Sequence, residues 1–180
     1  MRVITGKARG IALKTPDGMQ TRPTADRVKE ALFSIIQFEI PGARVLDLFG
    51  GTGQLGIEAL SRGAASAVFV DAREEACKLI RENLRRTKLE PFAQVVRNDY
   101  LEYLKRCRDT FNIILLDPPY AEVFLENALK TITEIDILQT GGIIIAERPV
   151  GKELPWNFDG YTRSRDYKYG KTLLTVYRKD

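Results

Sequence analysis

Short apolar segments alternate with amphipathic helical segments through most of this chain. The apolar segments are continuous, as is typical of strands that are buried on both faces of a parallel sheet. Between them, apolar residues recur at the three- and four-residue spacing of helices that pack on one face. This order predicts an α/β fold with a doubly wound, mostly parallel sheet. The predicted strands span 45–49, 67–70, 93–97, 111–116 and 143–146, and the predicted helices span 25–38, 55–62, 74–87, 101–106 and 124–131.

The two ends of the chain depart from this alternation. Residues 160–167 and 172–178 read as two strands joined by a tight turn, which predicts an antiparallel C-terminal hairpin at one edge of the sheet. Residues 2–5 and 10–13 read as a second, small β-hairpin at the N-terminus. The hairpin at the C-terminus brings the expected sheet to seven strands.

The length of 180 residues and the ordinary apolar content fit one domain with its own core. We expect the single domain 1–180 to consist of a basic hairpin extension, residues 1–20, and a Rossmann-like catalytic core, residues 21–180. No apolar run approaches the length of a membrane span, and the first residues do not resemble a signal peptide. These features predict a cytoplasmic protein with no membrane partner.

The chain contains no histidine, and its two cysteines lie far apart in predicted helices. Histidine is the commonest general base and a frequent metal ligand. Its absence argues against Ser-His-Asp and Cys-His catalysis and against most zinc sites, so we expect no metal ion. Two unpaired cysteines are typical of a reducing compartment.

Basic residues are concentrated at the two ends of the chain. Residues 1–30 hold seven basic and three acidic residues, and residues 161–180 hold six and two, whereas the rest of the chain is mildly acidic. If the two ends meet in space, they form one positive surface that suits a nucleic acid. The candidate phosphate contacts are Lys7, Arg9, Lys14, Arg22, Arg163, Arg165, Lys168 and Lys171.

A glycine-rich loop follows the first predicted strand. Its spacing, Gly51-x-Gly53-x-x-Gly56, matches the dinucleotide fingerprint, and Asp71 follows at about the expected distance. An NAD-dependent oxidoreductase is therefore one interpretation. Asp47 argues against it, because a carboxylate at the tip of the strand would repel a nearby pyrophosphate. No residues suited to hydride transfer accompany the loop.

An S-adenosylmethionine site accounts for more of these residues. Glycines let the backbone approach the cofactor closely, and Asp47 could orient the loop or help to hold the ammonium group. Asp71, at the end of the second strand, would accept hydrogen bonds from the ribose hydroxyls, and Asp99 would meet the adenine amino group. The residues predicted to bind the cofactor, from the glycine-rich loop and the strand ends, are Asp47, Phe49, Gly51, Gly53, Asp71, Asp99 and Asp117.

Asp117-Pro118-Pro119-Tyr120 directly follows the apolar strand 111–116. Proline has no backbone N–H, so this loop offers hydrogen-bond acceptors and almost no donors. Such a loop suits a substrate group that donates two hydrogens, namely an exocyclic amine of a nucleobase. Tyr120 provides a flat face on which the base can stack. These four residues are the predicted catalytic residues.

Several motifs resemble one family of enzymes. The glycine loop followed by the Asp-Pro-Pro-Tyr loop resembles the amino-methyltransferase branch of the class I S-adenosylmethionine-dependent enzymes. More specifically, the chain resembles the bacterial RsmD family along most of its length. The motifs that carry this resemblance are Gly6-Lys7-x-Arg9-Gly10, Arg22-Pro23-Thr24-x-Asp26-Arg27 and Glu58-Ala59-Leu60-Ser61-Arg62-Gly63.

The resemblance implies a methyltransferase that acts on N2 of a guanine in small-subunit (16S) ribosomal RNA during ribosome assembly. It implies that Arg22 and Thr24 also contact the cofactor and that the enzyme is a monomer. An adenine-N6 DNA methyltransferase remains an alternative, since adenine N6 is also an exocyclic amine. An oxidoreductase and a non-catalytic RNA-binding module also remain open.

Overall fold

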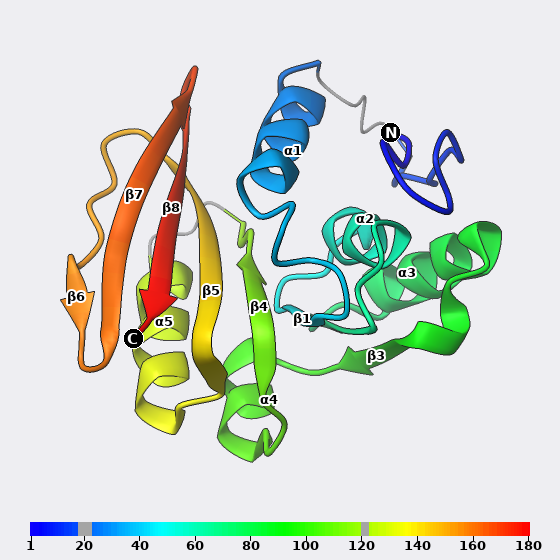
Figure 1. Ribbon diagram of the computed structural model, residues 1–180. Coiled ribbons are helices and arrows are strands. Elements are labelled where there is room, and N and C mark those ends of the chain that lie inside the picture. The colour runs from blue at the N-terminus through cyan, green and yellow to red at the C-terminus, as the bar shows by residue number, and fades with distance from the viewer. Residues whose placement is uncertain (18–22, 120–122) are drawn as a thin grey trace.

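The computed structural model describes residues 1–17, 23–119 and 123–180, and within them eight strands form one sheet (Figure 1). The strands are β1 (Arg44–Asp47), β2 (Ser66–Asp71), β3 (Ala93–Arg97), β4 (Phe111–Leu116), β5 (Leu138–Pro149), β6 (Asn157–Phe158), β7 (Tyr161–Tyr169) and β8 (Thr172–Lys179). Their order across the sheet is β3-β2-β1-β4-β5-β8-β7-β6. The strands from β3 to β5 run parallel, whereas β8, β7 and β6 are antiparallel to their neighbours. The predicted doubly wound sheet with an antiparallel C-terminal hairpin is confirmed.

Helices cover both faces of the parallel part of the sheet. One buried cluster joins the first three helices to one face, and it includes Leu32 and Phe69. A second cluster joins the last two helices to the opposite face, and it includes Leu104 and Ile132. Side chains of a strand point alternately to the two faces, so each central strand contributes to both clusters and is apolar throughout. The helices are α1 (Pro23–Ile35), α2 (Gln54–Ser61), α3 (Glu74–Thr87), α4 (Tyr100–Arg106) and α5 (Phe124–Ile135), with a 3₁₀ turn η1 (Glu90–Phe92).

None of the helices in the described ranges is long and apolar enough to cross a membrane.

The path of the chain across the sheet changes direction at β1. From β1 the chain continues outward to β2 and β3, and it then returns to the other side of β1 to form β4 and β5. In doubly wound sheets ligands bind at such a switch point, in the crevice outside the carboxyl ends of the strands. A functional site is therefore expected where β1 and β4 end.

The largest differences from the sequence-based strands concern β6 and β5. β6 consists of two residues paired with β7, and it makes the sheet eight-stranded instead of seven-stranded. A strand this short carries no alternating pattern, so periodicity could not reveal it. β5 begins at Leu138 and not at residue 143, because it continues through Gly141 and Gly142 past an irregularity in its pairing with β4.

The N-terminal segment (residues 1–14) packs on α2 and α3 (Figure 1). Its two arms are joined by one antiparallel bridge between Arg2 and Ala12, so the predicted hairpin is present with shorter strands than expected. The backbone N–H groups of Ile4 and Thr5 donate to the carboxylate of Glu58 in α2, at 2.8 and 3.0 Å. The segment is thus anchored through its backbone, which leaves its basic side chains free to face solvent.

Glu58 is the charged centre of this attachment, with an exposed fraction of 0%. Lys29 of α1 lies 3.7 Å from its carboxylate, and the Nε of Arg62 donates to it at 2.9 Å. A buried charge is tolerated only when it is paired and hydrogen-bonded, so this network joins α1 and α2 to the N-terminal segment. Asn83 of α3 adds a second anchor by accepting from the N–H of Lys14 at 2.7 Å.

We predict that Gly6→Ala destabilises the protein far more than Gly10→Ala. Both glycines have positive φ, +91° and +83°, so alanine is strained at either position, at a cost of about 1 kcal/mol. At Gly6 a Cβ would also collide with the backbone oxygen of Ser61, whereas at Gly10 it would meet nothing within 4 Å. Urea unfolding should show a loss of about 3 kcal/mol or more for Gly6→Ala. Equal losses for the two variants would contradict the close packing of this segment on α2.

Candidate functional site

Acidic side chains gather on one face of the sheet at the carboxyl ends of its parallel strands. All of them lie on the face that packs under α2. Each acid is two residues beyond a residue of the apolar cluster on that face, and side chains two residues apart in a strand share a face. Together they border the crevice at the switch point. These residues are Asp47 in β1, Asp71 in β2, Asp117 after β4 and Glu147 in β5.

A cavity of about 580 Å³ lies above these strand ends. Its lining comes from the glycine loop, the ends of the four central strands, the start of α4 and the loop that follows β4. The predicted site residues that border it are Asp47, Phe49, Gly51, Asp71, Asp99, Asp117, Pro118 and Pro119. The structure thus brings these eight residues together around one cavity at the strand ends.

Asp47 connects β1 to the start of α2. Its side chain is 1% exposed, and its Oδ2 accepts the backbone N–H of Gly56 at 3.0 Å. Its Oδ1 is buried and has no hydrogen-bond partner among the described residues. Burial raises the pKa of this carboxyl to about 8, the bond from Gly56 opposes the rise, and the charges of Asp117 and Asp71 add to it. A buried acceptor without a donor, in the wall of a cavity, suits a cationic or hydrogen-bond-donating ligand.

The glycine loop is held from its other side by Asp71. The Oδ2 of Asp71 accepts the backbone N–H of Gly51 at 3.0 Å. Its carboxylate also accepts from the backbone N and the guanidinium of Arg73, at 2.9 to 3.2 Å. Gly53, with φ of 81°, is the N-cap of α2, and a Cβ there would lie 3.2 Å from Ile57. The loop thus keeps its backbone close to the cavity.

Asp99 is the N-cap of α4. Its Oδ1 accepts the backbone N–H groups of Leu101 and Glu102, at 2.9 and 3.2 Å. This capping role accounts for part of its hydrogen-bonding capacity. Because Asp99 is exposed and borders the cavity, its second oxygen remains available to a ligand.

Three aromatic rings form one wall of the cavity. Phe49 lies 5.1 Å from Tyr100 and 6.3 Å from Phe124 between ring centroids, and Tyr100 lies 5.4 Å from Phe124. The sequence analysis identified only Phe49. Tyr100 and Phe124 come from α4 and α5, so only their tertiary placement brings them to the site. The wall offers flat apolar surface beside the acids, as a nucleoside would require.

Asp117 and Glu147 form a pair of neighbouring carboxyl groups. Burial raises the pKa of Asp117 to about 6. Burial and the charge of Asp117 raise the pKa of Glu147 to about 8. Glu147 was not identified from the sequence, although an acid that directly follows the apolar strand 143–146 was the available signal. Perturbed carboxyl groups in a cavity are candidates for proton chemistry and for binding amines.

The remaining predicted residues of this site are only partly described. Pro118 and Pro119 border the cavity, and neither has an N–H to donate. Arg22 and Tyr120 lie outside the described residues, and so does the side chain of Thr24. Among the described residues, no group of His, Cys, Asp and Glu side chains has the arrangement of a metal site.

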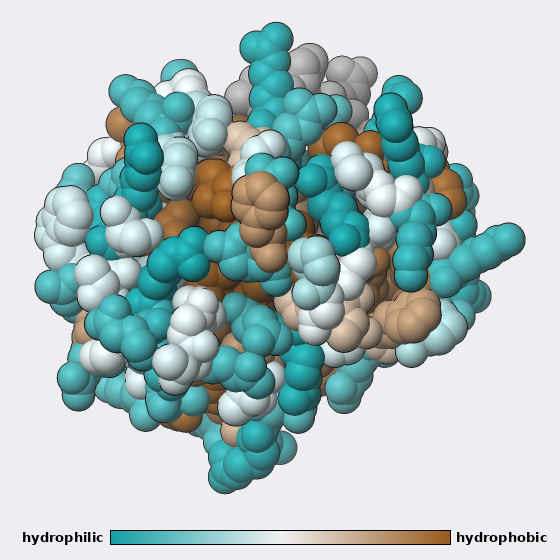
Figure 2. All heavy atoms as spheres, viewed as in Figure 1, coloured by the Kyte–Doolittle hydropathy of each residue, from teal (hydrophilic) through white to brown (hydrophobic). Residues whose placement is uncertain are grey.

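Within the described residues, the N-terminal segment (residues 1–14) and the C-terminal hairpin do not meet. The N-terminal segment and the β7–β8 hairpin lie on opposite sides of α1 (Figure 1). The same face is largely hydrophilic, with hydrophobic side chains visible between α1 and the hairpin (Figure 2). The expected single positive surface is therefore divided into two parts.

Most of the candidate phosphate contacts are exposed. They are Lys7, Arg9, Lys14, Arg165, Lys168 and Lys171. Lys14 forms an ion pair with Glu82, and Arg165 lies over the ring of Tyr167, 5.1 Å from its centroid. The prediction for Arg163 is wrong, since this residue is 6% exposed and is held by Asp166 and by the backbone oxygen of Leu154.

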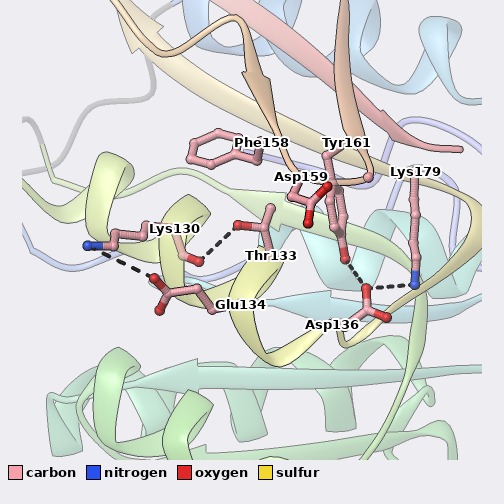
Figure 3. Close-up of a pocket in the computed structure, with 9 residues that line it drawn as sticks. Lys130, Thr133, Glu134, Asp136, Phe158, Asp159, Tyr161 and Lys179 are labelled. Atoms are coloured by element: carbon pink, nitrogen blue, oxygen red, sulfur yellow. Dashed lines mark hydrogen bonds and ion pairs between the residues drawn. The ribbon is translucent and has the colours of Figure 1, made fainter.

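A second cavity, of about 690 Å³, lies near the C-terminal end of α5 (Figure 3). Asp136 in this cavity accepts a hydrogen bond from Tyr161 at 2.8 Å and pairs with Lys179 at 2.7 Å. Lys130 and Glu134 pair across one turn of α5. These charged groups neutralise one another, and none of the residues at the carboxyl ends of the parallel strands lines this cavity, so it does not share the chemistry of the candidate site.

Comparison with known proteins points to one family. The model of the family described as "Conserved hypothetical protein 95" matches residues 1–178. The chain is 43% identical over 182 residues to "Putative rRNA methyltransferase YlbH" of Bacillus subtilis (strain 168), with 99% of each chain covered. It is 32% identical over 180 residues to "Ribosomal RNA small subunit methyltransferase D" of Escherichia coli (strain K12), covering 100% of this chain and 90% of the relative.

Solved structures are also similar to this chain along nearly its whole length. The structure named "Putative methyltransferase yhhF from Escherichia coli" matches with a TM-score of 0.91 and 30% identity, covering 100% of this chain and 98% of that one. A hypothetical protein of Thermus thermophilus matches with a TM-score of 0.85 and 32% identity, with 99% of each chain covered.

We predict that Asp47→Asn makes the ligand-free protein less sensitive to rising pH. Between the ordinary pKa of 3.8 and about 8, Asp47 is protonated in the folded protein and ionised in the unfolded chain. The folded state therefore binds more protons, and the free energy of unfolding falls as the pH rises through that window. Removing the group should increase the stability of the variant relative to the wild type by up to about 1.4 kcal/mol per pH unit.

The measurement is urea unfolding at a series of pH values from about 5 to 8. The exposed Asp17→Asn serves as the matched control and should follow the wild-type curve. Parallel curves for the wild type and Asp47→Asn would show that Asp47 is not protonated in the folded protein.

Proposed function

The chain belongs to the conserved hypothetical protein 95 family, and we propose that it methylates N2 of a guanine in small-subunit (16S) ribosomal RNA, using S-adenosylmethionine. The observation that carries this proposal is that the Asp117-Pro118-Pro119 loop and the glycine loop border one cavity. The names of its full-length relatives support ribosomal RNA as the substrate class. The proposed partner is the small subunit or its assembly intermediate, which the protein would bind as a monomer.

The residues of the cavity fit S-adenosylmethionine. The Oδ1 of Asp47 has no partner among the described residues and can accept from the ammonium group of the methionine moiety once the cation displaces the proton of this carboxyl. The loop at Gly51 lets the backbone approach. The carboxylate of Asp71 already accepts four N–H groups, one from Gly51 and three from Arg73, so a ribose hydroxyl would replace a bond from the Arg73 guanidinium. The wall of Phe49 and Tyr100 suits the adenine ring. When bound, this cofactor supplies a methyl group on a positively charged sulfonium, which is already activated for transfer.

Asp117 and Pro118 prepare the amine of the substrate. The lone pair of a guanine N2 amine is delocalised into the ring, so the amine is a weak nucleophile. In the proposed mechanism, the carboxylate of Asp117 and the backbone oxygen of Pro118 accept hydrogen bonds from the two N–H groups of the amine. These bonds localise the lone pair and orient it. Alignment of this kind can supply on the order of 7–11 kcal/mol in favourable systems.

Asp117 also suits the removal of the proton that the amine loses. Burial raises its pKa to about 6, close enough to neutral pH for a carboxyl group that exchanges a proton with the substrate or with water. Tyr120 is proposed to stack on the base, which must be unpaired or flipped to enter. Arg22 and Thr24 are proposed to contact the cofactor.

The exposed basic side chains are proposed to bind RNA phosphates. The N-terminal segment, which carries Lys7 and Arg9, lies on one side of α1, and the β7–β8 hairpin, which carries Arg165 and Lys168, lies on the other (Figure 1), so one RNA could contact both elements. Lys14 and Arg22 complete the proposed set. Contacts to phosphates give affinity and register but do not identify the base.

We predict that Asp117→Asn reduces methyl transfer to small ribosomal subunits on the order of 10²- to 10³-fold, a larger factor than its effect on cofactor affinity. The amide keeps the shape of the side chain but cannot take up the proton, and it replaces one acceptor by a donor. Turnover is followed with methyl-labelled S-adenosylmethionine, and cofactor binding by calorimetry. Near-normal turnover with intact cofactor binding would refute the role of Asp117, and the exposed Asp17→Asn controls for loss of charge.

We predict that replacing Lys7 and Arg9 together by alanine weakens RNA binding and makes it less dependent on salt. Two phosphate contacts should lower the slope of log K against log salt by roughly 1.4 to 1.8. Cofactor affinity should not change, because both side chains are exposed and neither borders the cavity. Filter binding of ribosomal RNA at several salt concentrations measures the slope. Equal losses of RNA and cofactor affinity would mean that the two residues are structural.

A further inference from the structure

Glu147 occupies the position next to Asp117 on the neighbouring strand. Leu116 of β4 pairs with Ala146 of β5 in parallel register, so Asp117 and Glu147 are the next residues along the two strands. Neighbouring strands lie about 4.8 Å apart. Both side chains point to the same face, and both border the cavity. Arg148 follows on the opposite face, where it is buried and paired with Asp166.

The protein scaffold leaves the carboxyl group of Glu147 unused. Among the described residues, no donor forms a hydrogen bond or an ion pair with it, although the group is partly buried beside a second carboxyl. By contrast, the buried Glu58 of α2 accepts hydrogen bonds from Ile4, Thr5 and Arg62 and forms an ion pair with Lys29. Among the described residues, the one fully buried side-chain oxygen without a partner belongs to Asp47, so water reaches the oxygens of Glu147 in the free protein, and a donor of the ligand can replace that water.

The proposed substrate has a donor where Glu147 needs one. On its Watson–Crick edge, guanine carries the N1–H directly beside the N2 amine. If Asp117 and Pro118 hold the N2 amine, the neighbouring N1–H points in a similar direction and can donate to the carboxylate of Glu147 beside Asp117. Adenine has an unprotonated N1, an acceptor, beside its amine. An ionised carboxylate accepts hydrogen bonds and donates none.

We infer that Glu147 accepts the N1–H of the target guanine and thereby selects guanine over bases with an unprotonated N1 beside the amine. This inference rests on the proposed function. It makes Glu147 a specificity-determining residue, while Asp117 prepares the amine. A base that places an acceptor against the carboxylate leaves two acceptors facing each other, which is a strong basis for rejection.

The test replaces the target guanine by 2,6-diaminopurine, which keeps the N2 amine but has no N1–H. Small subunits are reconstituted with RNA that carries either base at the methylated position. The assay is run at about pH 8.5, above the pKa of about 8, so that Glu147 is largely ionised. The wild type should prefer guanine on the order of 10- to 100-fold in kcat/KM, as expected for a hydrogen bond to a charged group.

In Glu147→Gln the side chain offers both a donor and an acceptor, so the preference should fall to within about threefold. Glu147→Asp keeps a carboxylate and should retain a preference for guanine, and the exposed Glu153→Gln should behave like the wild type. The preference for guanine over 2,6-diaminopurine is measured from the affinity for RNA as well as from kcat/KM. A variant of low activity can therefore still be tested.

Two results would overturn the inference: a wild type that does not distinguish the two bases, or a Glu147→Gln variant that keeps the wild-type ratio. Both are distinguishable from failure of the proposed function. If the proposed function is wrong, the wild type forms no N2-methylguanosine on the guanine-containing subunits. If only the inference is wrong, the product forms and the ratio does not depend on Glu147.

Discussion

The hydrogen bond from the backbone N–H of Gly56 to the buried carboxylate of Asp47 is the interaction on which the site depends. It joins the end of β1 to the first turn of α2 and so fixes the glycine loop between them. The second oxygen of Asp47 has no donor among the described residues, and it lies at the wall of the cavity. One buried acid thus shapes the loop and leaves an acceptor for a cationic ligand. This arrangement places a cost on the ligand-free protein that a bound ligand can remove.

The N-terminal segment supports the same helix from outside. Glu58 of α2 is neutralised by Lys29 of α1 and by Arg62, and it accepts the backbone N–H groups of Ile4 and Thr5. Through this network the segment that carries Lys7 and Arg9 is attached to the helix that follows the glycine loop. The proposed RNA contacts of this segment and the cofactor loop are therefore attached to the same helix, whereas Arg165 and Lys168 lie on the separate β7–β8 hairpin.

The sequence predicted the parts of the structure that depend on local pattern. The bounds of α3 and the acids at the strand ends follow from helical spacing and from continuous apolar runs. Tyr100 and Phe124 were missed, because two helices distant in sequence bring them together. The sequence predicted Arg163 to be a surface charge, whereas it is buried and paired with Asp166 of the same hairpin. Glu147 was missed although it obeys the same rule as Asp117.

The central claim is that this cavity methylates N2 of guanine in small-subunit RNA. The most direct measurement incubates the protein with methyl-labelled S-adenosylmethionine and small ribosomal subunits that lack their native modifications, and then identifies the labelled nucleoside by mass spectrometry. The account predicts labelled N2-methylguanosine as the product. Labelled N6-methyladenosine, or cofactor binding without any labelled nucleoside, would contradict it.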